Sequence, residues 1–184
     1  LKGVLDNEDG LIFKVTGDMT LDCYVDASFA GLWNYVDDQD PVCVKSRTSY
    51  VMTLGGCPIH WASKLQTLVA LSTCESEYIA LAQALRELIP IRRLLESLAS
   101  LHSAEGAQVL VKSTIFEDNN GAISMTQSPN MSPRTKHIVT CYHFIKKYFG
   151  KHHVEQHPFV LQKIGADDQK ADIFIKILML ANSR

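Results

Sequence analysis

Four acidic residues, distant from one another in the sequence, lie in local contexts typical of regular elements: Asp26, Glu77, Asp118 and Asp172. Carboxylates gathered in one place repel one another unless cations separate them. Carboxylate oxygens are also the ligands with which proteins bind pairs of divalent metal ions for phosphoryl chemistry. The sequence therefore predicts a divalent-metal site, provided that the fold brings these four residues together.

The neighbouring acids have simpler explanations. Glu75 follows Ser72 by three residues, which is the spacing of a capping box at the start of a helix. Glu117, next to the candidate Asp118, is expected at the surface. Each of the four candidates also has a structural explanation when taken alone, as a turn former or as a partner of a helix dipole. The metal prediction therefore depends on the four in combination.

The elements that must position these residues follow from hydrophobic periodicity. Alternation predicts a strand over residues 21–26, and three apolar, β-branched runs predict an antiparallel meander over 48–54, 59–62 and 67–71. Helical spacing then begins near Ser72, is expected to stop at Pro90, and resumes over 91–98. Further elements are expected as a strand over 109–116, a short helix, a helix over 136–148, a strand over 159–164 and a helix over 168–180. This order predicts an α/β fold, with a mixed sheet covered by helices.

Composition limits the class of protein. The 184 residues are 46% apolar, which suits one well-buried domain, and no apolar run reaches the length of a membrane span. The five cysteines are scattered without a CxxC pair, so we expect reduced thiols. The chain begins with Leu1, and we expect it to be a segment of a longer polypeptide. It contains no GxxxxGK loop, GxSxG elbow or HExxH motif.

Positive charge is concentrated in one segment, although the net charge is only −2. Residues 119–154 contain no Asp or Glu. Within them, the candidates for nucleic-acid contact are Asn119, Arg134, Lys136, His137, Lys146 and Lys147. Such a segment is consistent with contact along a phosphate backbone and equally with a solvated helix face.

Seven segments in order resemble the ribonuclease H domain of copia-type retrotransposon Pol polyproteins. They are residues 22–31, 45–51, 70–81, 117–123, 134–138, 142–144 and 171–176, and the resemblance extends to about Leu180. It implies that residues 1–20 are the end of the reverse transcriptase connection, that 21–180 form the ribonuclease H domain, and that 181–184 are a tail. It also implies a ribonuclease H-like fold with a five-stranded mixed sheet flanked by helices.

The same resemblance implies a function. It implies hydrolysis of the RNA strand of RNA–DNA hybrids during reverse transcription, in the cytoplasm within a virus-like particle, with the nucleus as an alternative location. Asp26, Glu77, Asp118 and Asp172 match the acids that hold two Mg²⁺ ions, with Mn²⁺ as an alternative. The implied partners are the hybrid and the adjoining reverse transcriptase domain, with no membrane.

Some residues depart from the family pattern. Ser49 replaces a usual glycine and is expected to strain a position that needs positive φ. Ile175 and Ile177 are unusual in the helix expected to carry Asp172, and we expect them to shift its carboxylate. These departures leave an alternative open: a degenerate or co-opted copy that keeps the fold as a nucleic-acid-binding or connecting module.

Overall fold

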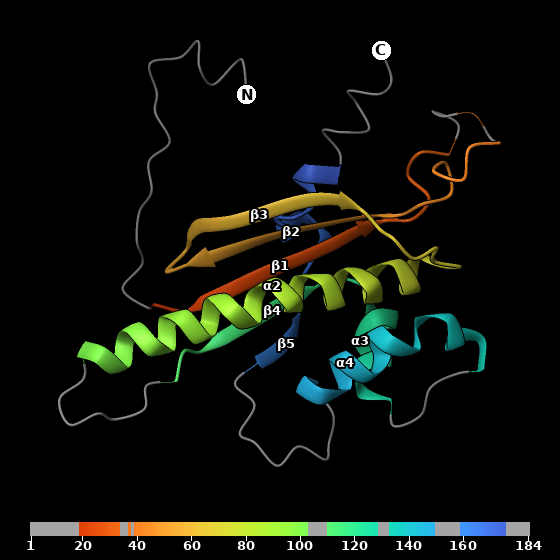
Figure 1. The fold of residues 1–184 in the computed structure, drawn as a ribbon. Helices are drawn as coiled ribbons and strands as arrows, with labels where there is room; N and C mark the ends of the chain where they lie inside the picture. Colours follow the sequence, from red (N-terminus) through yellow and green to blue (C-terminus); the bar gives the residue numbers. More distant parts are fainter. Residues whose placement is uncertain are drawn as a thin grey trace, which may run out of the picture.

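Five strands form one mixed sheet with the order β3-β2-β1-β4-β5 (Figure 1). The structure is a computed structural model that describes residues 19–33, 37, 39–102, 110–128, 133–149 and 159–175. The strands are β1 (Leu21–Ser28), β2 (Arg47–Leu54), β3 (Cys57–Leu65), β4 (Ser113–Glu117) and β5 (Phe159–Lys163). β1, β2 and β3 pair antiparallel, whereas β4 pairs parallel with β1 and with β5. The predicted α/β class and the five-stranded mixed sheet with flanking helices are confirmed.

The helices that flank the sheet are α2 (Thr73–His102), α3 (Asn120–Gln127) and α4 (Val139–Phe149), with 3-10 helices η2 (Pro133–Ile138) and η3 (Ala166–Asp168). Among the described residues, no helix combines the length and apolar character needed to cross a membrane. β1 begins at Leu21, where the domain boundary is predicted. Residues 1–18 and 176–184 lie outside the described part of the chain, so the domain limits stay predictions.

The meander has two strands after β1, because the expected run over 67–71 is not a strand. β2 and β3 are joined by Gly55 and Gly56, whose φ angles of 55° and 82° suit a tight hairpin turn between Leu54 and Cys57. The prediction of a further strand is wrong, since residues 66–72 form the connection to α2. Leu68, Val69 and Leu71 are exposed there, whereas Ala70 is buried in the core.

α2 runs as one helix through Pro90, so the predicted break there is wrong. Pro90 lies on the exposed side of the helix, where water can solvate the carbonyl that loses its hydrogen bond. On the other side, Leu88 and Arg92 are buried on either side of the proline. Packing of the helix against the sheet therefore outweighs the local cost of proline.

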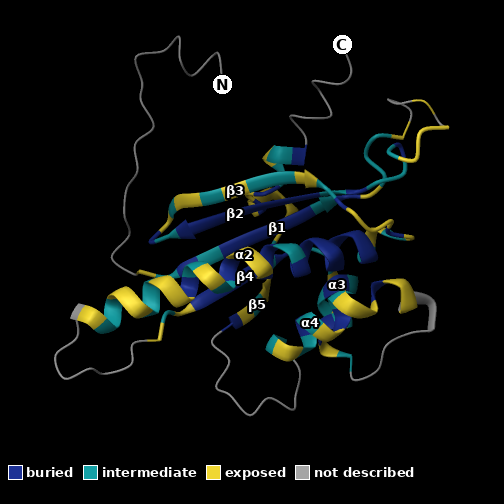
Figure 2. Cartoon of the chain, in the orientation of Figure 1, coloured by how far each residue is buried: buried dark blue, intermediate teal, exposed yellow. Residues whose placement is uncertain are grey.

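One face of the sheet forms the core with these helices. Alternate residues of β1, namely Leu21, Cys23 and Val25, are fully buried, and they pack with buried residues of α2 such as Tyr78 and Leu81. Figure 2 shows that α2 is buried along its N-terminal half, which contacts the sheet, and that exposed residues occur along its C-terminal half. This packing fixes the N-terminal end of α2 beside the carboxyl end of β1 (Figure 1).

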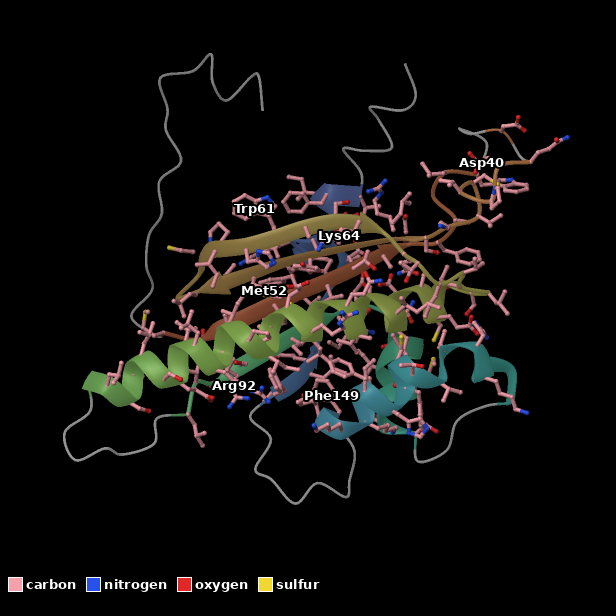
Figure 3. All side chains as sticks on the ribbon, in the orientation of Figure 1. Asp40, Met52, Trp61, Lys64, Arg92 and Phe149 are labelled. Carbon is pink, nitrogen blue, oxygen red and sulfur yellow. The ribbon has the colours of Figure 1, made fainter. Side chains whose placement is uncertain are left out.

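Arg92 connects the middle of α2 to the segment just before β4. Its Nε donates to the Val111 carbonyl at 3.1 Å, and its Nη2 pairs with Glu96 Oε1 at 2.5 Å. The guanidinium carbon also lies 4.9 Å from the centre of the Phe159 ring on β5, between α2 and β5 in Figure 3. These contacts connect α2 to the segment before β4 and to β5, which pairs with β4.

Candidate metal centre

Asp26, Glu77 and Asp118 converge. Each offers a carboxylate oxygen, and these three atoms all lie within 4.8 Å of one another. We call these three residues the carboxylate trio. Asp26 and Glu77 are buried, with 9% and 6% of their surface exposed, and Asp118 is half-buried. Three of the four acids predicted from the sequence therefore share one site.

The three residues of the trio come from β1, from α2 and from the end of β4. Asp26 is near the carboxyl end of β1, opposite Ser49 of β2. Glu77 is in the second turn of α2, a helix that starts after Ser72, whose Oγ accepts from the Glu75 amide at 3.3 Å. The Glu75 side chain completes the cap differently from the prediction, because it accepts from the Leu71 amide at 2.7 Å.

Asp118 directly follows β4 and precedes the helix cap of α3. Asn119 caps that helix, and its side-chain oxygen accepts from the amides of Gly121 at 2.8 Å and Ala122 at 3.1 Å. The strand end and the cap together define the backbone on both sides of Asp118. Its position is therefore set by β4 and α3 at once.

Asp172, the fourth predicted acid, is not among the residues whose oxygens lie within 4.8 Å of one another, and it lies in a turn that the sequence did not predict. The expected helix over 168–180 is wrong at its start, because η3 ends at Asp168, residues 170–172 form a turn, and helical backbone resumes at 173. Residues 176–180 lie outside the described part of the chain. The turn is tied to the sheet, because Ser49 Oγ donates to the Ala171 carbonyl at 2.8 Å and Gln169 Nε2 donates to the Val25 carbonyl at 2.8 Å. These bonds hold Asp172 near Asp26.

Ser49 was expected to strain the backbone, but it instead makes a hydrogen bond that joins two parts of the site. Ala30 is the only non-glycine residue with positive φ in the described ranges, so Ser49 carries no such strain and that expectation is wrong. Its hydroxyl instead connects β2 to the turn that carries Asp172. Ile175 is buried, and Ile177 lies outside the described residues.

Burial and like charge act together on the site. Burial, followed by the charges of Asp118 and Asp172, raises the pKa of Asp26 from 3.8 to about 6. The pKa of Glu77 is raised in the same direction, first by burial and then by the charges of Glu117, Asp26 and Asp118. Without a cation, both shifts make ionisation of these acids harder than in the unfolded chain.

The residues present fit a divalent cation. Among the described residues, no Lys, Arg or His forms an ion pair with the trio. Glu77 Oε2 is buried and accepts no hydrogen bond from any described group. An oxygen in that state is costly in a protein interior unless a proton or a cation compensates it. Carboxylate oxygens from three elements are the donor set that Mg²⁺ and Mn²⁺ prefer.

Glu117 is a fifth carboxylate that the sequence prediction misplaced. It was expected at the surface, yet none of its surface is exposed. The alternation of a strand contained the signal: Glu117 is two residues after Ile115, and residues separated by two share one face of a sheet. Since Ile115 is a core residue, Glu117 also points toward the helices.

The predicted nucleic-acid contacts have mixed surroundings. Lys136 and Lys147 are exposed, whereas Lys146 Nζ donates to the carbonyls of Thr126 and Ser128 at the end of α3. The side chain of Arg134 lies outside the described residues.

His137, another of these candidates, pairs with Glu75. Its Nε2 lies 3.0 Å from Glu75 Oε2 and so ties η2 to the start of α2. His137 therefore has a structural role in this contact, as Asn119 has in the cap of α3. For the whole set, contact with nucleic acid stays a prediction.

The raised pKa of Asp26 has a consequence for stability without metal. A group whose pKa is raised on folding contributes stability that is complete below its unfolded value and is lost as the pH rises through the folded value. For Asp26 this window runs from about pH 4 to about pH 6, and a shift of about 2 units corresponds to about 3 kcal/mol. Urea unfolding in EDTA at pH 4 and pH 7 measures this loss.

The control for this prediction is Asp26→Asn, which cannot ionise. We expect it to lack that part of the decrease and to be more stable than the parent chain at pH 7. If the free energies of unfolding of parent and variant change in parallel between pH 4 and pH 7, the ionisation of Asp26 is not the cause of the loss.

Sequence comparison finds relatives among transposon polyproteins. The chain is 34% identical over 161 residues to the retrovirus-related Pol polyprotein from transposon TNT 1-94 of Nicotiana tabacum. It is 33% identical over 171 residues to that from transposon RE2, and 32% identical over 169 residues to that from RE1, both of Arabidopsis thaliana. The alignments cover 88%, 93% and 92% of this chain, which spans about a tenth of the length of each relative. No family model matches the chain.

Comparison with solved structures finds ribonuclease H folds. The chain is similar to LC11-RNase H1, isolated from compost, with a TM-score of 0.56 and 15% identity over 90% of this chain and 99% of the other. It is also similar to the N-terminal RNase H domain of Rv2228c from Mycobacterium tuberculosis, with a TM-score of 0.53 and 9% identity over 90% and 97% of the two chains. At these identities the likeness establishes the fold.

Proposed function

We propose that this chain hydrolyses the RNA strand of RNA–DNA hybrids. The proposal starts from its ribonuclease H fold and from its homologues, which are the Pol polyproteins of copia-type transposons. The observation that carries the proposal is the convergence of the trio within 4.8 Å. Homology and fold support a ribonuclease H-type nuclease, and the trio supplies the oxygen ligands that such chemistry requires.

The proposed ligands of Mg²⁺, or of Mn²⁺, are the trio together with Asp172. Bound divalent ions supply charge stabilisation at the phosphate and an activated water at neutral pH. The chain's own residues orient the ligands: β1 and β4 fix Asp26 and Asp118, and α2 brings Glu77 to them. The Ser49 and Gln169 hydrogen bonds, which join the residues just before Asp172 to β2 and β1, support Asp172 as a further ligand.

The proposed substrate is the hybrid, recognised by backbone and 2′-hydroxyl contacts rather than by base sequence. Exposed Lys147 lies on α4, which packs against α3, the helix that follows Asp118. Exposed Lys136 lies on η2, which packs against α4 and α2. Their charge suits a phosphate backbone that passes near the trio. The proposed partner is the adjoining reverse transcriptase domain of the polyprotein, which adds further contacts to the hybrid.

The experiment that tests the function is cleavage of a labelled RNA–DNA hybrid by the chain joined to its adjoining polymerase segment. We expect RNA fragments in Mg²⁺, no fragments in EDTA, and no cleavage of an RNA or DNA duplex. Absence of cleavage, with hybrid binding retained, would favour the alternative of a nucleic-acid-binding module that has lost catalysis.

A further inference from the structure

Two aromatic rings stack between the strands that lead to Asp26 and Asp118. Tyr24 of β1 and Phe116 of β4 are direct neighbours in the parallel register of these strands. Their ring centres are 4.7 Å apart and their planes differ by 16°, and this separation is within the range that aromatic pairs prefer. Each ring precedes its acid by two residues, so the Tyr24 and Asp26 side chains share one face of β1. The stacked pair therefore connects the two strands just before each reaches its acid.

Lys170 adds a third member to this pair. Its Nζ lies 4.4 Å from the centre of the Tyr24 ring, which is within the distance for cation–π attraction. Lys170 also precedes an acid by two residues, because Asp172 follows in the same turn. We call Lys170, Tyr24 and Phe116 the Lys170 stack. Its members come from the three segments that carry Asp172, Asp26 and Asp118.

Tyr24 is buried on the face of the sheet opposite α2. Only 8% of its surface is exposed, whereas Cys23 and Val25, which alternate with it, pack on the α2 side. Lys170 is exposed, so its ammonium keeps contact with water while it lies over the ring. A cation–π contact at such an exposed site changes a local equilibrium by about two- to fivefold. The Lys170 stack is therefore expected to adjust the position of the turn and not to determine the fold.

Two hydrogen bonds of 2.8 Å already fix this turn to β1 and β2, through Gln169 and Ala171 on either side of Lys170. The Lys170 stack adds β4, because Phe116 belongs to that strand. β4 is also the strand that leads to the trio. Together, these contacts relate the turn that carries Asp172 to β1, β2 and β4.

We propose that the Lys170 stack positions Asp172 as a fourth ligand beside the trio. The inference rests on the metal site of the proposed function and adds residues that orient one of its ligands. Lys170 and Tyr24 are positioning residues, because they act through the turn that carries Asp172. The alternative is that Lys170 is a solvated surface residue whose contact with Tyr24 leaves the turn unchanged.

Four variants separate these alternatives. Lys170→Met keeps an unbranched side chain but has no charge, whereas Lys170→Arg keeps a cation that stacks on aromatic faces. Lys112→Met is the matched control, since Lys112 is exposed and lies just before β4, at the end of the strand away from Asp118. Tyr24→Leu removes the ring, so Lys170→Met in that background should have no further effect.

The first readout is amide hydrogen exchange of the full chain in EDTA, measured for each residue by NMR. The Ile175 amide donates to the Asp172 carbonyl at 3.0 Å, so its exchange rate reports opening of this segment. We expect this amide to exchange about two- to fivefold faster in Lys170→Met than in the parent. In Lys170→Arg and in Lys112→Met it should exchange at the parental rate.

The second readout is calorimetric titration of the same preparations with Mn²⁺. Lys170→Met should weaken binding by about two- to fivefold, and Lys170→Arg should bind with the parental affinity. An unchanged exchange rate or an unchanged affinity in Lys170→Met would overturn the inference, because the contact would then not act through the turn on the ion.

Asp118→Asn distinguishes this failure from failure of the proposed function. If Asp118→Asn loses the ion and Lys170→Met binds it as the parent does, only the role of the Lys170 stack is wrong. If the parent chain binds no Mn²⁺, the metal site itself is wrong and the inference is wrong with it.

Discussion

Asp118→Asn is expected to lower the rate of hybrid cleavage by about a thousandfold or more while the domain stays folded. Asparagine keeps the size of aspartate but removes the negative charge that a divalent ion needs at this position. The fold should tolerate the change, because Asp118 follows the strand and its charge raises the pKa of Asp26 by repulsion. We therefore expect the variant to unfold at a higher temperature than the parent in EDTA.

The measurement combines initial rates on the labelled hybrid with thermal unfolding of the same preparations. Asp167→Asn is the control, because Asp167 is an exposed acid of η3 outside the trio. Its rate should equal that of the parent. An Asp118→Asn variant that retains the parental rate, or that fails to fold, would count against a metal-ligating role.

Gly121→Ala is expected to reduce cleavage by about 10- to 100-fold through misplacement of the trio. A Cβ at Gly121 would lie 2.8 Å from Cys74 Sγ and 3.0 Å from Asn119 Oδ1, so neighbouring atoms must move. Cys74 is one turn before Glu77, and Asn119 follows Asp118. The added methyl therefore separates two elements that carry the trio, and small displacements of catalytic groups have large kinetic effects. Overpacking should also lower stability by about 1–3 kcal/mol.

Two further variants make this prediction specific. Cys74→Ala in the Gly121→Ala background removes the sulfur contact and should restore part of the rate, although the contact of 3.2 Å with the Cys74 Cβ remains. Gly165→Ala should have little effect, because its nearest neighbour would be Asp168 Oδ2 at 3.7 Å and its φ is −74°. If Gly121→Ala lowers the cleavage rate equally with and without Cys74→Ala, the α2–α3 contact does not determine the geometry of the trio.

The parts of the fold with strong periodicity could be predicted from the sequence. β1 follows from the alternation that buries Cys23 and Val25, and the start of α2 follows from the spacing of Ser72 and Glu75. The candidate acids at Asp26, Glu77 and Asp118 were each attached to such an element. Their convergence was implied by the resemblance, through the fold and the matching acids, because local periodicity gives no sheet order.

The wrong predictions arose where tertiary packing outweighs local preference. Pro90 has a strong local tendency to end a helix, but buried neighbours on both sides keep α2 continuous. The apolar residues 67–71 looked like a strand, but they form the connection between β3 and α2. Glu117 was assigned by its charge instead of by its position in β4, and the anchoring of Asp172 through Ser49 required the structure.

The position of a bound cation tests the account most directly. Crystals of the chain grown with Mn²⁺ can be measured at a wavelength where the metal scatters anomalously. We predict an anomalous peak within about 2.5 Å of carboxylate oxygens from Asp26, Glu77 and Asp118. Absence of a peak at the trio in millimolar Mn²⁺, or a peak only at other residues, would contradict the assignment of this site.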